Sequence, residues 1–136
     1  MDGEARELVK EGKVTACYPE RHAVRVEFED KDGLISDELP VLRSWAWQNK
    51  SYAMPDVGEV VVCLFASNAD QTGTGWVIGS RYHDHSPPKV TSQDKARIDF
   101  RDGTFIEYDR AKHELRIKCV GKIYIDGTEI HLNESS

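Results

Sequence analysis

The chain has 136 residues, of which 39% are hydrophobic and 31% are charged. A chain this short and polar has room for one modest core or two small parts, so some of it is expected to depend on a partner or on its own copies. Its 24 acidic and 18 basic side chains give a net charge of −6. That balance argues against broad binding to nucleic acid, because phosphate contacts need concentrated Lys and Arg.

The opening stretch MDGEARELVKEGK is polar. It predicts about two turns of helix over residues 1–10 and no secretory signal. Cys17, Cys63 and Cys119 lie far apart in apolar, strand-like segments. This odd number, without a CxxC pair, predicts buried free thiols in a reducing compartment rather than disulfides or a zinc site. We therefore expect a protein made in the cytoplasm without a targeting signal.

Period-two alternation of apolar residues replaces helical periodicity from Gly12 onward. Two alternating segments, 14–18 and 24–28, flank a turn at 19–22 and predict a β-hairpin. Further strands are predicted at 39–42, where Pro40 indicates an edge, and at 59–65 and 75–79. Five strands within about 70 residues fit a small OB-type barrel better than a sandwich, which needs about seven.

A proline-containing segment without periodicity, HDHSPPKVTSQ, follows the predicted barrel and marks a boundary between domains. The predicted organisation is an N-terminal extension at 1–11, an OB-fold domain at 12–82, a linker at 83–95 and a β-helical needle at 96–136.

The C-terminal segment consists of short apolar strands separated by turns such as Asp102-Gly103 and Asp126-Gly127. Such a meander cannot bury one face alone, and its open edges favour pairing with other chains. We therefore expect three copies to wrap around one axis as an intertwined triple-stranded β-helix. The residues predicted to face this axis are Ile98, Phe100, Ile106, Tyr108, Leu115, Ile117, Ile123, Ile125, Ile130 and Leu132.

Four stretches carry a family resemblance: GKVTACYPERHAVRVEF, MPDVGEVVVCLF, TGWVIGSRYHDHSPP and RIDFRDGTFIEYDRAKHELRI. In this order and spacing they resemble the phage baseplate assembly protein V family, the central tail spike, which is similar to type VI secretion spikes. The resemblance implies an N-terminal OB barrel, a homotrimeric β-helix and a mechanical role in a virion or phage-tail-like particle such as a tailocin. It also implies contacts with tail tube, hub and baseplate proteins, and a rigid tip that helps to pierce the target cell envelope.

Spikes of this family often end in an apex that holds iron through a His-x-His pair from each chain. The sequence here ends GTEIHLNESS, with a lone His131. The resemblance therefore implies either a blunt spike or a separate spike-tip protein, and no cofactor is expected.

His83 and His85 form the most suggestive local cluster, since two histidines two residues apart in an extended backbone can share a metal. A rival hypothesis is thus a metal-dependent enzyme that uses this pair with nearby carboxylates. Their position in a proline-flanked linker favours plain surface residues instead. The acidic residues of the needle alternate with apolar ones, which favours a solvated outer face over acid–base catalysis; they are Asp99, Asp102, Glu107 and Asp109. No enzyme is predicted.

Trp45, Trp47 and Tyr52 resemble the stacking platform of an OB-fold module that binds single-stranded nucleic acid, which is the alternative function. Arg43 and Lys50 are the only basic residues between Gly33 and Ser80, and residues 1–90 carry 10 basic and 15 acidic side chains. Because a nucleic-acid groove needs a strongly basic surface, packing in a core or interface is the favoured explanation of the tryptophans.

Overall fold

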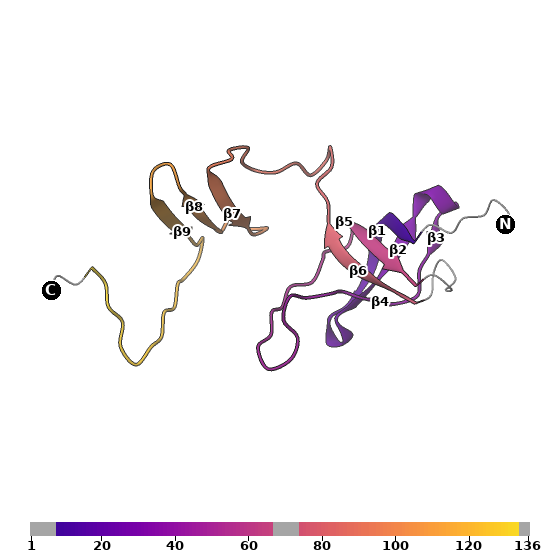
Figure 1. Ribbon diagram of the computed structural model, residues 1–136, viewed down its shortest axis with the longest axis horizontal. Coiled ribbons are helices and arrows are strands. Elements are labelled where there is room, and N and C mark those ends of the chain that lie inside the picture. The colour runs from indigo at the N-terminus through magenta and orange to yellow at the C-terminus, as the bar shows by residue number, and fades with distance from the viewer. Residues whose placement is uncertain (1–7, 67–73, 134–136) are drawn as a thin grey trace. The chain divides into compact units, whose positions relative to one another are not determined.

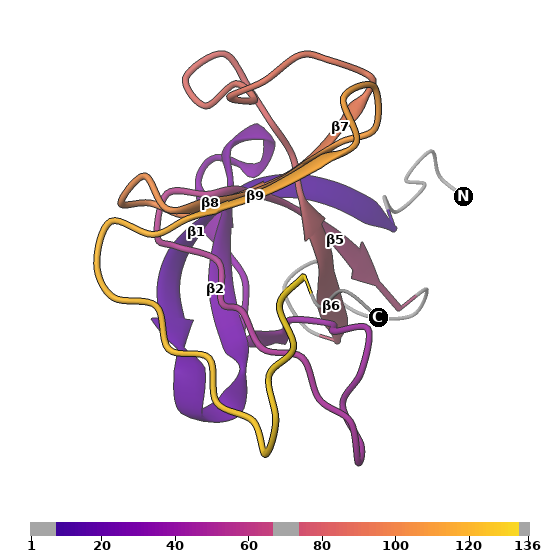
Figure 2. The same cartoon turned by 90° about the vertical axis from the view of Figure 1, so that its left-hand side faces the viewer.

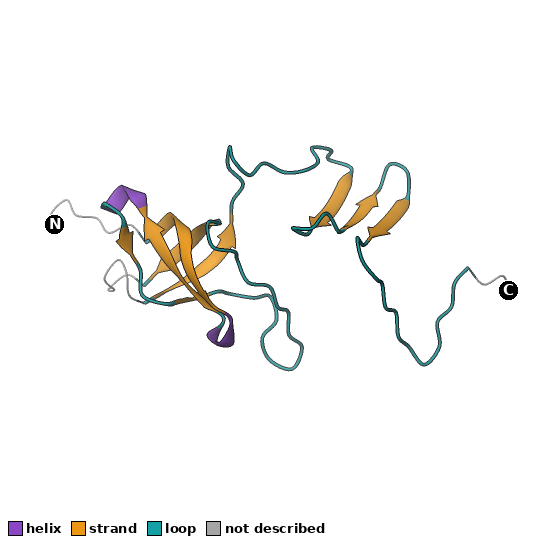
Figure 3. Ribbon diagram, turned by 180° about the vertical axis from the view of Figure 1, so that it is seen from behind, coloured by secondary structure: helices purple, strands orange, loops and turns teal. Residues whose placement is uncertain are grey.

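The computed structural model describes residues 8–66 and 74–133. The regular elements in these residues are strands and two single turns of 3-10 helix, so the predicted all-β class is confirmed (Figures 1 and 3). The chain divides into two compact units, residues 1–87 and 88–136. The elements are β1 (Val9–Tyr18), η1 (Pro19–Arg21), β2 (Ala23–Phe28), η2 (Glu29–Lys31), β3 (Leu34–Ile35), β4 (Leu39–Pro40), β5 (Val60–Phe65), β6 (Gly75–Ser80), β7 (Lys95–Asp99), β8 (Phe105–Asp109) and β9 (Glu114–Lys118).

The predicted hairpin forms from β1 and β2, which pair antiparallel around η1. A β-bulge at Thr15 shifts the register between Val14 and Ala16. Because each residue along a strand changes face, the bulge exchanges the inward and outward positions beyond it. Val14 is buried in the core. Of the three half-buried residues that follow the bulge, Cys17 packs against the core cluster, whereas Ala16 and Tyr18 do not belong to it. The alternation predicted through 14–18 is therefore broken by this bulge.

The strands of the first unit form a closed ring. The sheet order is β3-β2-β1-β5-β6, and β4 pairs with the other part of β2. Beyond β4, Val41 forms a parallel bridge with Val77 of β6, and the Leu42 N–H donates to the Val77 carbonyl at 3.0 Å. The ring therefore runs β1-β2-β4-β6-β5 and returns to β1, and Figure 2 shows β1 and β2 curving beside the β5–β6 pair.

The hydrophobic core lies inside this ring. Its inward residues come from alternate positions, so β2 and β5 each bury every second side chain. Phe28 and Phe65 meet edge to face, with ring centroids 5.8 Å apart. The cluster consists of Val14, Val24, Val26, Phe28, Leu39, Val61, Cys63, Phe65 and Val77.

Two details near the start of the chain differ from the sequence-based expectation. The helix predicted for 1–10 is wrong at Val9 and Lys10, which begin β1 and pair with β5; residues 1–7 lie outside the described residues. The two-residue strand β3 was not predicted, because Leu34–Ile35 is too short to show an alternating pattern. It extends the sheet beside the end of β2.

The second unit contains one antiparallel meander, β7-β8-β9. Gly103, at φ 96°, and His113, at φ 58°, lie in its two turns. The further strands predicted around residues 123–125 and 130–132 are wrong for the single chain: between Lys118 and Asn133 the structure has no strand. Within the described chain no strand lies beside these residues, so their backbone forms no inter-strand hydrogen bonds.

Candidate assembly surface

One face of the β7–β9 meander is apolar. The register places Ile98, Ile106 and Ile117 opposite one another across the three strands. The neighbouring row contains Ala96, Tyr108 and Leu115, all on the same face since they lie two residues away. Ile98 is 58% exposed and Leu115 is 64% exposed. The described residues therefore leave this face open to water.

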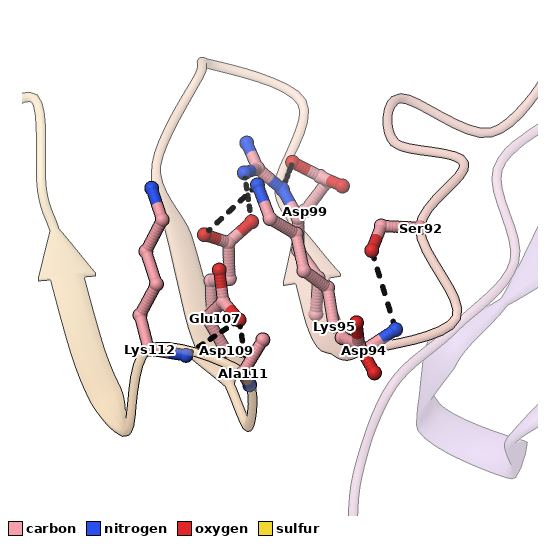
Figure 4. Close-up of polar contacts among 9 residues, drawn as sticks. Ser92, Asp94, Lys95, Asp99, Glu107, Asp109, Ala111 and Lys112 are labelled. Atoms are coloured by element: carbon pink, nitrogen blue, oxygen red, sulfur yellow. Dashed lines mark hydrogen bonds and ion pairs between the residues drawn. The ribbon is translucent and has the colours of Figure 1, made fainter.

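The opposite face carries a connected set of charges. Glu107 in β8 accepts from Arg97 of β7 at 2.7 Å and lies 3.6 Å from the Lys95 ammonium (Figure 4). Arg97 also donates to Asp99 at 2.9 Å, and its guanidinium stacks 3.8 Å from the centroid of the Phe105 ring. The hydrogen bond from Arg97 lowers the pKa of Glu107, and the same bond raises the pKa of Arg97.

The burial of the two faces is inverted relative to a sheet that covers its own core. Arg97 and Glu107, on the charged face, are half-buried, whereas Ile98 and Ile106, on the apolar face, are exposed. Among the described residues of the second unit, Asp109 is the one buried side chain. This unit thus has no apolar core of its own in the part that the structure describes, and its apolar face is available to another chain.

Every residue predicted to face a trimer axis is exposed in the single chain. Phe100 lies just beyond β7, where its N–H donates to the Thr104 carbonyl at 2.8 Å. Four others follow β9 in the unpaired segment. The exposed residues are Ile98, Phe100, Ile106, Tyr108, Leu115, Ile117, Ile123, Ile125, Ile130 and Leu132.

The histidines considered as metal ligands are bound within their own turns. His83 and Ser86 exchange backbone hydrogen bonds, and the His83 Nδ1 accepts from the His85 N–H at 3.3 Å. Their ring centroids lie 6.2 Å apart, beside an open groove of about 580 Å³. His131 lies 2.9 Å from Glu129. No group of three or more potential metal ligands occurs within residues 8–66 and 74–133.

The carboxylates considered for acid–base chemistry hold turns and ion pairs instead. Asp102 accepts from the Thr104 N–H at 2.9 Å, and this bond lowers the pKa of Asp102. Asp109 accepts from the N–H groups of Ala111 and Lys112 at 3.0 and 3.3 Å, which fixes the β8–β9 turn (Figure 4). Together with the Arg97 contacts of the charged face, these bonds give each carboxylate a structural partner.

The tryptophans of the β4–β5 connection lie outside the core, so core packing is the wrong explanation for them. Trp45 is 63% exposed and Trp47 is 82% exposed, and Tyr52 is 68% exposed, with its ring edge-on to His22 at 5.2 Å between centroids. One feature of the sequence could have indicated that this loop is a separate surface: residues 39–55 contain no Asp or Glu, although the chain is acidic. This loop is a second exposed apolar surface.

The cysteines differ in their surroundings. All three are free, but only Cys63 is buried, whereas Cys17 and Cys119 are half-buried, so the prediction of three buried thiols is wrong for two of them. Burial in the core raises the pKa of the Cys63 thiol to about 12. The Cys17 thiol donates to the Pro55 carbonyl at 3.1 Å.

None of the described residues belongs to a helix of sufficient length and apolarity to span a membrane. Comparison with protein-family models gives no match to this chain. A search of curated proteins likewise gives no match.

Proposed function

We propose that the chain is a structural, non-enzymatic component of a contractile tail: a homotrimeric spike at the tip of the tail tube in a phage or phage-tail-like particle. The observation that carries the proposal is the second unit's exposed apolar face. Three copies that bring these faces together around one axis would bury the apolar rows and leave the Arg97–Glu107 network outside. Removing open strand edges in this way produces a stiff rod.

The topology of the first unit supports an OB-type barrel in this proposal. An OB barrel is a five-stranded Greek-key barrel. The ring β1-β2-β4-β6-β5 has five members, and its closing contact between Val41 and Val77 is parallel, whereas the other pairings in the ring are antiparallel. Such a barrel, with its own core, would hold the rod in the hub while the sheath contracts.

The unpaired segment after β9 supports the intertwined needle. Its backbone lacks strand partners within the described chain, yet Ile123 and Ile125 repeat at a spacing of two, as do Ile130 and Leu132. Such a segment can form ladders with the same segment of neighbouring copies, which would bury its alternate residues. A rod built this way acts mechanically, by transmitting the push of the sheath to the target cell envelope, and needs no cofactor.

The test is the solution mass of the full chain by light scattering, together with that of a chain ending at Pro87. The full chain should have three times the 15.4 kDa mass of one copy. The shorter chain retains every residue of the hydrophobic core and should be folded but have lost the assembly contributed by the needle. A monomeric full-length chain would overturn the proposal, and binding of single-stranded DNA would then be tested for the alternative function.

A further inference from the structure

The β4–β5 connection is a loop that is held by its own backbone hydrogen bonds and exposes aromatic side chains to solvent. Ala46 and Lys50 form an antiparallel bridge, and the Ser51 N–H donates to the Trp45 carbonyl at 3.0 Å. The Trp47 N–H donates to the Asn49 carbonyl at 3.2 Å, which closes the tip. We call residues 42–54 the tryptophan loop. A loop held in one shape displays its indoles at low entropic cost, and exposed Trp residues of this kind are typical anchors of protein interfaces.

The tryptophan loop also has a positive charge within an acidic chain. It carries Arg43 and Lys50, and the nearest carboxylates in sequence are Glu38 and Asp56. The chain as a whole has a net charge of −6. The complementary surface for this loop is therefore apolar with an acidic rim. Two cations on an otherwise acidic unit are too few to hold an anionic membrane or a nucleic-acid backbone.

The first unit itself contains a groove of this kind. It has a volume of about 410 Å³, and its lining includes the apolar residues Val9, Gly12 and Val60. The other lining residues are three basic ones, Lys10, Lys13 and Arg81, of which Lys10 is buried, and four acidic ones, Glu11, Glu27, Glu29 and Asp30.

Two of these carboxylates are engaged by cations of the same chain. Arg81 pairs with Glu11 at 2.9 Å, and Lys13 pairs with Glu29 at 3.6 Å. Within the residues that the structure describes, no ion pair engages Glu27 or Asp30. We call this surface the acidic groove, and it has two carboxylates available to a partner.

Loop and groove are different patches of the same unit, and Figures 1 and 2 show the loop between β4 and β5 projecting away from η2, which borders the groove. This is the arrangement that a closed ring of copies requires, because each head-to-tail interface joins two different surfaces. An isologous contact would instead need one self-complementary patch.

We propose that the tryptophan loop of each copy docks in the acidic groove of the next copy, with Trp47 against Val9 and Val60 and with Arg43 and Lys50 beside Glu27 and Asp30. The inference rests on the proposed trimer and adds a second interface to it, between the first units. Each interface is then completed by residues of two copies, and the exposed indoles are covered by the assembly itself.

The test is a photo-cross-linking experiment on the full chain with benzoylphenylalanine introduced at position 47. Irradiation should join separate chains, and mass spectrometry should place the cross-links within residues 9–13 or 27–30 of the second chain. Light scattering on the same sample distinguishes the two proposals. A trimer without cross-links to these residues overturns the docking inference alone, whereas a monomer overturns the trimer as well.

Charge exchange provides an independent readout. The double variant Glu27→Lys and Asp30→Lys should weaken trimer association several-fold, and adding Arg43→Glu and Lys50→Glu should restore it. The control is Asp84→Lys, an exposed carboxylate outside both surfaces, which should leave association unchanged. Absence of rescue by the combined variant, with a folded protein, contradicts the inference.

Discussion

Gly12 in β1 provides a direct test of the packing between the strands of the first unit. A Cβ placed there would lie 2.5 Å from the Val26 Cγ1 atom and 2.6 Å from the Glu27 carbonyl oxygen. It would also lie 2.9 Å from the Phe28 ring. The carbonyl oxygen belongs to the backbone of β2, so it cannot rotate away as the end of a side chain can. Gly12→Ala therefore forces β1 and β2 apart where both contribute to the core.

The expected cost follows from these contacts. Overpacking a well-packed core costs about 1–3 kcal/mol. Restricting the unfolded chain by Gly→Ala offsets about 0.4–1 kcal/mol. The net destabilisation is roughly 1–2 kcal/mol, which corresponds to a fall of roughly 5–15 °C in Tm for a unit of this size. Thermal unfolding of the full chain, followed by circular dichroism, measures this shift.

Gly79→Ala is the matched control. Gly79 lies in β6 of the same sheet, and a Cβ there would meet nothing within 4 Å. This variant should unfold at the wild-type temperature or slightly above it, because only the unfolded state is affected. If Gly12→Ala is as stable as Gly79→Ala, the close approach of β1 to β2 is refuted.

Three further predictions concern the second unit and the core thiol. Ile106→Asn should reduce the trimer population in light scattering, since each buried Ile contributes about 1.5–3 kcal/mol. The control Arg116→Asn, on the opposite face, should leave the trimer population unchanged. An unchanged mass of the Ile106→Asn variant would contradict the burial of the apolar face. Because Arg97 lowers the pKa of Glu107, the stabilisation from this pair is present above the unfolded-state pKa and lost as pH falls through the lower folded-state pKa. The acid limb of a pH–stability profile should therefore be shallower for Glu107→Gln, and identical profiles would count against the pair. Burial raises the pKa of Cys63 to about 12, so iodoacetamide in mildly alkaline buffer should label it only after unfolding; rapid labelling of the native chain would disprove its burial.

The strands of the first unit could be predicted because their side chains alternate between core and solvent. Residues 24–28 show the alternation in sequence, whereas 60–65 form a continuous apolar run, and both segments bury every second residue in the structure. The bulge at Thr15 could not be predicted, since one extra residue changes the register without a distinct composition. The same holds for β3, whose pairing depends on where the chain returns to β2 and not on its own two residues.

The exposed surfaces were partly visible in the sequence. The apolar residues of the second unit were identified as a face that needs a partner, and the register of β7, β8 and β9 aligns five of them, together with Ala96, in two rows. The segment after Lys118 was expected to form strands, but strand pairing needs a neighbour, and a single chain offers none there. The tryptophans were attributed to packing in a core or interface because the acidic surroundings argued against a nucleic-acid groove, and only the structure shows Trp47 in solvent.

The unequal distribution of buried side chains between the two units has a consequence for how the protein responds to dilution. The first unit contains the hydrophobic core of the described chain, so a single copy should fold this unit even at low protein concentration. In the proposed trimer the second unit buries its apolar face against other copies, so its folding is linked to their concentration by mass action. Heating dilute protein should then still show the unfolding transition of the first unit, whereas the transition of the second unit should move to higher temperature as the protein concentration rises. In the proposed assembly, newly made chains would have a folded first unit and an exposed apolar face in the second unit until they meet. Formation of the trimer, rather than folding of the first unit, would then be the step limited by concentration.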